Sequence, residues 1–289
     1  MKIKVTANTD TGKVREHNED SFLTLGGKSS PPGIDALLVV ADGMGGHAAG
    51  EVASQMTVEG IQRAIGGEDL TSRELSGNAL GGLLGKVLED VNKEVWKAGQ
   101  TPERQGMGTT CTLAAIRGDQ LFLAHIGDSR AYLLRDGAIH QVSTDHSWVE
   151  EAVAMGTLSR EAARIHPNRN VITRAIGLDL KAQIDVSAIP IENGDLILLC
   201  SDGLNSMIDD DEIERILKES AQKEVCQALI DAANGQGGHD NTTVVVATIG
   251  SVRKSQVVTQ PSAAGQDTQE ISVGSTWWKR LAKAVFRRR

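Results

Sequence analysis

The stretch from Leu37 to Gly43, LLVVADG, decides the fold: an apolar run of strand-forming residues ends at an aspartate, and a glycine follows at once. Similar arrangements recur along the chain, each with an aspartate at one end of a short apolar run. The other instances are Asp128 after residues 122–127, Asp202 after residues 196–201 and Asp240 before residues 243–249. The pattern predicts four aspartates at the ends of four buried strands.

These aspartates indicate a site for hard divalent cations. One unpaired carboxylate at the end of a buried strand is costly, and four that converge repel one another unless cations lie between them. Taken alone, an aspartate before a glycine is more typical of a turn, so the repetition is what favours a metal site. The chain has no HxxxH or CxxC spacing, and oxygen ligands therefore point to Mg²⁺ or Mn²⁺ rather than to zinc.

Composition excludes several classes of protein. The 289 residues are 40% hydrophobic, enough for one large domain or two small ones. A formal net charge of −8 argues against nucleic-acid binding by the body of the protein. Three cysteines without disulfide or metal spacing predict reduced thiols in a cytoplasmic protein. Residues 1–11 lack the apolar run of a signal peptide, and no segment approaches the roughly 18 apolar residues of a membrane span.

The order of the expected elements predicts an α+β fold. Helices are expected from residue 48 to about 65 and at 80–96, 147–155, 209–218 and 223–233. Strands are expected at 1–8, 21–25, 36–41, 108–116, 121–126, 130–134, 139–142, 171–176, 182–188, 195–201 and 243–249. Strands and helix pairs come in blocks rather than alternating, which favours two antiparallel β-sheets packed as a sandwich and flanked by helices, αββα. Short connections predict three or four neighbouring antiparallel strands between 108 and 142.

Two other segments depart from this pattern. Residues 144–171 combine a short helix with Arg164, His166 and Arg169, and we expect them to form a charged flap over the site. The composition changes after Gly250, which predicts one folded domain with the metal site at 1–250, a disordered linker at 251–275 and a basic aromatic amphipathic tail at 276–289. From residue 251 onward there are eight basic and two acidic residues, a net charge of +6 that leaves −14 for the rest.

The motifs together resemble the metal-dependent protein phosphatases of the 2C type, and most of all their bacterial branch. The matching motifs are Arg15-x-x-Asn18-Glu19-Asp20, Val40 to His47 (VADGMGGH), Gly108-Thr109-Thr110, Gly127-Asp128-Ser129-Arg130, Ser201-Asp202-Gly203 and Asp240-Asn241-Thr242-Thr243. They stand in the expected order from Met1 to about Gly250. The resemblance implies a β-sandwich flanked by helices and the hydrolysis of phosphoserine and phosphothreonine in proteins.

The resemblance also implies roles for the candidate residues. Asp42 is expected to bridge two Mg²⁺ or Mn²⁺ ions, with a hydroxide between them as the nucleophile. The further ligands are expected to be the carbonyl of Gly43, the carboxylates of Asp202 and Asp240, and, through water, Glu19 and Asp20. Asp128 with Asp202 resembles a weaker site for a third ion. Arg15 is expected to bind the phosphate, because its fork grips two oxygens, and Asn241 to orient its neighbours.

The proton donor for the leaving group is less defined. Many eukaryotic relatives have a histidine directly after the Asp-Gly pair, whereas this chain has Met44 there. His47, three residues later, is the candidate general acid. Two other readings remain: His47 only shapes substrate binding, and a metal-bound water supplies the proton.

Alternative functions and partners follow from the same residues. A catalytically silent module that binds phosphoproteins would have lost a metal ligand, and a phosphatase for a small metabolite would not need a charged flap. The expected partners are phosphorylated proteins and a bacterial Ser/Thr kinase whose action the enzyme reverses, with the protein itself a monomer. Residues 276–289 suit contact with an anionic lipid surface or an acidic partner, at the inner membrane surface of a cytoplasmic protein.

Overall fold

The computed structural model describes residues 1–45, 49–66 and 77–252. The chain divides into one compact unit at Met1–Lys254 and a second at Ser255–Arg289. The second unit lies outside the described residues, so the linker at 251–275 and the tail at 276–289 stay predictions. The helices within the described ranges are all too short or too polar to cross a membrane.

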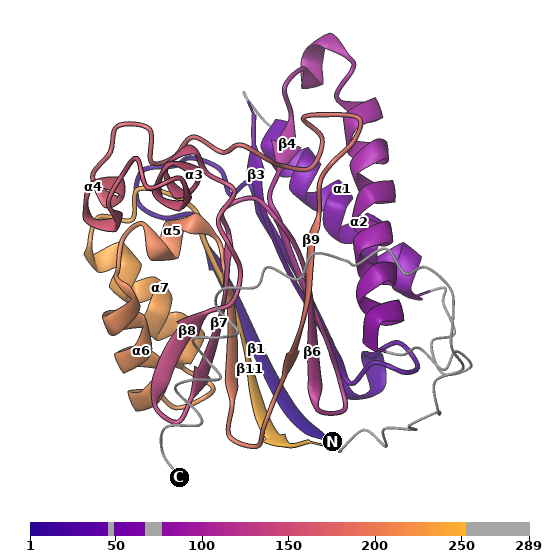
Figure 1. Ribbon diagram of the computed structural model, residues 1–289, viewed down its shortest axis with the longest axis vertical. Coiled ribbons are helices and arrows are strands. Elements are labelled where there is room, and N and C mark those ends of the chain that lie inside the picture. Colours follow the sequence, from indigo (N-terminus) through magenta and orange to yellow (C-terminus); the bar gives the residue numbers. More distant parts are fainter. Residues whose placement is uncertain (46–48, 67–76, 253–289) are drawn as a thin grey trace. The chain divides into compact units, whose positions relative to one another are not determined.

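Two antiparallel sheets form the centre of the first unit, as predicted (Figure 1). One sheet runs in the order β1 (Lys2–Asp10), β11 (Thr242–Ser251), β10 (Leu196–Cys200), β7 (Arg130–Arg135) and β8 (Ala138–Gln141). The other runs in the order β2 (Asp20–Gly26), β3 (Ala36–Met44), β5 (Cys111–Arg117), β6 (Gln120–Ile126) and β9 (Asp185–Pro190), and β4 (Gly108–Thr109) pairs with the end of β3.

A pair of helices covers the outer face of each sheet, which confirms the αββα layers (Figure 1). Helices α1 (Ala49–Gly66) and α2 (Gly77–Ala98) pack on the sheet that contains β3, and α6 (Asp210–Glu219) and α7 (Val225–Gly235) pack on the sheet that contains β10. Three short helices, α3 (Trp148–Ala154), α4 (Arg160–Arg164) and α5 (Asp202–Asn205), lie toward one end of the sandwich. Two 3₁₀ turns occur elsewhere, at Gly27–Ser29 and Pro102–Arg104.

Strand β3 shows why the apolar runs contain no polar residues. Leu37 and Val39 pack with α1 and α2 in one core cluster. Leu38 and Val40 point to the opposite face, because side chains alternate along a strand, and they are fully buried as well. That face meets the second sheet, since β3 contacts β10 and β11. A strand buried on both faces needs a continuous apolar run, which is what this sequence has.

The expectation that three or four strands between residues 108 and 142 are neighbours was wrong. β5 pairs with β6 in one sheet, and β7 pairs with β8 in the other. The chain crosses from the first sheet to the second within residues 127–129, so a short connection here joins two layers instead of two adjacent strands. Asp128 therefore lies on the crossing.

Three other local expectations need correction. Residues 171–176 form no strand and make only isolated bridges, because their backbone bonds go to the flap and to Thr109. Strand β9 begins at Asp185 rather than at 182. The short helix α5 was not predicted: it begins at Asp202, directly after Ser201, which has extended backbone angles. A four-residue helix is too short to leave a periodic apolar pattern.

Leu38→Ala is expected to lower the free energy of unfolding by about 2–5 kcal/mol, because it opens a cavity between the two sheets. The control is Met155→Ala, at a side chain that is 76% exposed, which should change stability by less than about 0.5 kcal/mol. Urea denaturation of both variants measures the difference. Equal losses in the two variants would show that the sheets are not packed face to face at Leu38.

Candidate active site

The structure brings the predicted aspartates together at one end of the sandwich. Asp42 lies in β3 directly opposite Asp20 of β2, within one sheet. Asp202 follows β10 and Asp240 precedes β11, in the other sheet. Asp128 comes from the crossing between the sheets. Carboxylates that lie up to 220 residues apart in the sequence thus converge, as their positions at strand ends predicted.

Burial and mutual repulsion raise the pKa values of these carboxyl groups. Burial is the main cause for Asp42, whose pKa is well above its ordinary value, and the negative charges of Asp20, Asp202, Asp128 and Asp240 add to it. Burial likewise raises the pKa of Asp20 to about 7, and with the charge of Asp240 raises that of Asp202 to about 6. A hydrogen bond to Asp42 acts in the opposite direction on Asp202. Without cations, bound protons would have to neutralise some of these carboxylates and so reduce the repulsion among them.

Two buried carboxylate oxygens show that the cluster fits cations. Oδ1 of Asp20 and Oδ1 of Asp128 are buried and have no hydrogen-bond partner in the described part of the chain. An unpaired buried acceptor costs roughly 1–3 kcal/mol, and a hard divalent ion satisfies it. Within the described ranges no three Asp, Glu, His or Cys side chains already form a closed ligand set. The carboxylates would therefore turn toward an ion on binding.

The two Asp-Gly pairs need glycine for close packing. A Cβ on Gly43 would lie 2.2 Å from the carbonyl oxygen of Gly50, and one on Gly203 would lie 2.0 Å from that of Asn241. The backbone N–H of Gly43 donates to the carbonyl of Glu19 at 3.1 Å. The glycines thus let neighbouring backbones approach the aspartates, a reason that the sequence pattern did not reveal. The role of the Gly43 carbonyl as a ligand stays a prediction.

Threonine side chains and backbone fix the position of Asp42. The carbonyl of Asp42 accepts from the Thr110 N–H at 2.9 Å and from the Thr109 hydroxyl at 2.8 Å. Its N–H donates to the Thr110 hydroxyl at 3.0 Å, and that hydroxyl also contacts the Ser129 hydroxyl at 2.7 Å. Sequence reasoning gave these residues no role, although two adjacent threonines at a strand start were visible.

Ser201 was also missed as a residue of the site. Its hydroxyl donates to Oδ2 of Asp20 at 2.7 Å and accepts from the N–H of Thr243 at 2.9 Å. These bonds join β2 of one sheet to the β10 and β11 ends of the other. Because the bond lowers the pKa of Asp20, it partly offsets the larger effect of burial.

Arg15 lies at the edge of the cluster, and its binding of phosphate stays a prediction. Its guanidinium is half exposed and lies 2.7 Å from Oδ2 of Asp240. Glu19, nearby, packs against the first turn of α1, and burial raises its pKa although the charge of Arg15 opposes the shift. His47 lies outside the described residues.

Asn241 holds the segment that carries Arg15. Its side-chain oxygen accepts from the N–H of Glu19 at 2.8 Å. Its side-chain amide donates to the carbonyls of Thr11 and His17, each at 2.9 Å. The side chain is nearly fully buried, so these bonds are shielded from water. The predicted orienting role of Asn241 has a direct structural basis in these three contacts.

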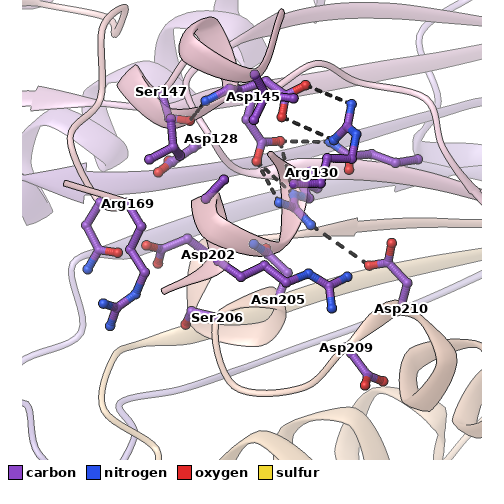
Figure 2. Close-up of a pocket in the computed structure, with 18 of the residues that line it drawn as sticks. Asp128, Arg130, Asp145, Ser147, Arg169, Asp202, Asn205, Ser206, Asp209 and Asp210 are labelled. Atoms are coloured by element: carbon purple, nitrogen blue, oxygen red, sulfur yellow. Dashed lines mark hydrogen bonds and ion pairs between the residues drawn. The ribbon is translucent and has the colours of Figure 1, made fainter. Parts of the chain in front are cut away.

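A cleft of about 440 Å³ opens beside the cluster, between the flap and helices α5 and α6. Figure 2 shows Asp128, Asp202 and Arg169 toward one side of this cleft, and Arg130 and Asp210 toward the other side. Arg164 also lines this cleft. Arg160 pairs with Glu150 and Arg130 with Asp145, whereas Arg164 and Arg169 form no ion pair within the described part of the chain.

Comparisons with known proteins identify the family of this chain. Residues 12–257 match the family model described as protein phosphatase 2C. The serine/threonine phosphatase stp of Listeria monocytogenes is 39% identical over 240 residues, 82% of this chain and 92% of the relative. The serine/threonine phosphatase of S. agalactiae has a similar structure, with a TM-score of 0.79 and 34% identity over 86% of this chain and all of that one. The catalytic domain of the phosphatase PstP, solved with two manganese ions, has a TM-score of 0.72 and 35% identity over 85% of this chain and 97% of that one.

The raised pKa of Asp20 predicts how pH affects the metal-free protein. An acid whose pKa is raised from 3.8 to about 7 on folding loses stability as the pH rises between those values, because the folded state must give up a proton that it holds more tightly. In EDTA, Asp20→Asn should therefore be more stable than the wild type at pH 8 and equally stable near pH 4. Thermal unfolding at both pH values measures this; a stability difference that does not change with pH would contradict it.

Proposed function

This chain belongs to the protein phosphatase 2C family and is a metal-dependent protein-serine/threonine phosphatase, and from this premise we propose that it uses two divalent cations at the aspartate cluster to hydrolyse phosphoserine and phosphothreonine. The observation that supports the mechanism is the convergence of five buried or half-buried aspartates from both sheets on one point. Mg²⁺ and Mn²⁺ are the ions that such oxygen ligands suit.

The residues at the cluster have two roles: the aspartates would bind the cations, and Arg15 would bind the phosphate. Asp42 would hold both ions, Asp202 and Asp240 would complete one site, and Asp128 with Asp202 would hold a third ion. When bound, the ions would lower the pKa of a water molecule and so supply the nucleophile at neutral pH. Arg15 would bind the phosphate oxygens, and its contact with Asp240 places it at the rim of the cluster. No protein nucleophile is needed.

The cleft favours a protein substrate over a small metabolite. It extends from Asp128 and Asp202 along the flap and is larger than a phosphate group requires. Arg164 and Arg169 line it and have no ion-pair partner among residues 1–45, 49–66 and 77–252, so within that part of the protein they are available to acidic or phosphorylated residues that flank the phosphorylated residue. We infer that the substrates are phosphorylated proteins and that the enzyme reverses a Ser/Thr kinase.

A silent phosphoprotein-binding module is not favoured. Such a protein would have lost at least one ligand, and the carboxylates at 42, 128, 202 and 240 are all present. The structure also retains what positions them, including the bonds from Thr110 to Asp42 and from Asn241 to Glu19. A module without catalysis would not need to retain a cluster whose charges destabilise the metal-free fold.

Hydrolysis of a phosphothreonine peptide by this protein should require Mn²⁺ or Mg²⁺ and stop in EDTA. Asp42→Asn should reduce kcat at least about 100-fold while leaving the fold intact, because it removes a charge that both ions share. Released phosphate and the far-UV circular dichroism spectrum measure the two effects. Full turnover by Asp42→Asn, or turnover in EDTA, would contradict the proposed metal mechanism.

The double variant Arg164→Ala with Arg169→Ala should raise KM about tenfold or more for a phosphothreonine peptide with flanking acidic residues, because it removes two charge-assisted contacts. The same variant should hydrolyse p-nitrophenyl phosphate with unchanged kcat. Arg63→Ala, which removes an exposed arginine paired with Glu94 on the far helices, is the control and should change neither parameter. If peptide KM stays unchanged in the double variant, the cleft does not bind the flanking residues.

A further inference from the structure

A second open cavity, of about 310 Å³, lies where α2 ends. Pro102, Met107 and Leu178 supply its apolar groups, and the other described residues around it are glycines and uncharged polar residues. None of the described lining residues carries a charge, whereas charged side chains such as Asp128 and Arg164 line the cleft beside the flap. The second cavity therefore suits an uncharged, apolar group.

Backbone hydrogen bonds hold one wall of this cavity. The N–H of Arg104 donates to the carbonyl of Thr101, and the N–H of Met107 donates to the carbonyl of Arg104, each at 3.1 Å. The N–H of Gly99 donates to the carbonyl of Val95 at 2.9 Å, so this wall continues directly from α2. The wall therefore has a defined shape before any ligand binds.

Asn92 of α2 holds the opposite wall. Its side chain is fully buried. The side-chain oxygen accepts from the N–H of Gly177 at 2.8 Å, and the side-chain amide donates to the carbonyls of Asp179 and Leu180 at 3.0 and 3.2 Å. These bonds fix the backbone on both sides of Leu178, whose own side chain is 41% exposed. An apolar side chain held in place beside an open cavity favours a ligand that covers it, because little has to be ordered on binding.

The cavity is connected to the aspartate cluster through β4. Gly108, the first residue of β4, pairs with Met44, which lies two residues beyond Asp42 in β3. A Cβ on Gly108 would lie 3.1 Å from the side chain of Leu178, so the cavity begins at this strand. Two residues of extended strand span roughly 7 Å. A peptide bound at Asp42 therefore reaches the cavity within a few residues.

The cavity and the flap cleft lie on different sides of the cluster. Figure 1 shows β4 beside α1 and α2, whereas α3 and α4 of the flap lie across the same end of the sandwich. Asp128 and Asp202 line the cleft, and no described residue lines both the cleft and the cavity. A peptide whose phosphorylated residue lies at the cluster can thus meet the cleft on one side and the cavity on the other.

We propose that this cavity is a second substrate subsite, which binds one uncharged apolar side chain two to four residues from the phosphorylated serine or threonine. This deepens the proposed function, on which it rests: the arginines of the flap select acidic residues on one side of the phosphorylated residue, and the cavity selects an apolar residue on the other. A charged small molecule would find no counter-charge in the described lining, whereas a leucine side chain would bury itself against Leu178 and Pro102.

Three single substitutions separate this subsite from its surroundings. Leu178→Ala removes an apolar wall of the cavity. Gln105→Trp keeps that wall and fills the cavity from an exposed position in its lining. Leu180→Ala is the matched control, because Leu180 lies two residues further along the same segment, is 47% exposed and is absent from the lining.

The experiment compares phosphothreonine peptides in which leucine replaces serine at one position at a time, from four residues before the phosphothreonine to four after it. Released phosphate gives kcat and KM for each peptide. For the wild type, leucine should lower KM about tenfold at one position, two to four residues from the phosphothreonine, because the leucine side chain is buried on binding. Leu178→Ala and Gln105→Trp should lose most of this effect, and Leu180→Ala should keep it. All four proteins should hydrolyse p-nitrophenyl phosphate with the same kcat.

Specific outcomes would overturn the subsite. These are a wild-type KM that leucine lowers at no position, an effect of leucine that survives in both Leu178→Ala and Gln105→Trp, and an equal loss in Leu180→Ala. Variants that change the oligomeric state in size-exclusion chromatography, with unchanged peptide KM, would assign the cavity to a second copy of the chain and overturn it too. Normal Mn²⁺-dependent hydrolysis of p-nitrophenyl phosphate without any preference for leucine would end this inference alone, whereas absent hydrolysis would end the proposed function.

Discussion

Repulsion among buried carboxylates is the constraint on which the rest of the structure depends. Asp20 and Asp42 come from one sheet, Asp202 and Asp240 from the other, and Asp128 from the chain between the sheets. Burial raises the pKa of four of them, Asp20, Asp42, Asp128 and Asp202, and two of their oxygens have no hydrogen-bond partner among the residues that the structure describes. A fold that gathers such groups at one point is less stable without counterions than one that scatters them. Their presence is therefore evidence of a metal function rather than of a structural role.

The sandwich gives this cluster a rigid support. β3 and β10 are apolar on both faces; Asp42 lies near the end of β3 and Asp202 lies two residues after β10, so the packing of the sheets fixes the positions of both aspartates. Thr109, Thr110 and Ser201 then set the backbone and side-chain orientation through hydrogen bonds. The flap, by contrast, is bonded chiefly to itself. The residues for catalysis thus lie on the rigid sandwich, and residues for substrate contact lie on the less rigid flap.

Sequence reasoning recovered what depends on local pattern. The apolar runs located the core strands, and their terminal aspartates located the site, because strand ends on one side of a sandwich must meet. The sequence prediction failed where the structure depends on which strands pair with one another. The short connection between β6 and β7 predicted neighbouring strands, yet Gly127 has a positive φ and the chain changes sheets there. Ser201 was missed for the same reason: its partner Asp20 lies 181 residues away.

Anomalous diffraction from crystals grown with Mn²⁺ tests the central claim most directly. The account predicts at least two strong anomalous peaks within coordination distance of Asp42, with Asp202 and Asp240 turned toward them, and a weaker peak beside Asp128. An active crystal form with Mn²⁺ bound elsewhere, and no anomalous density among these carboxylates, would contradict it.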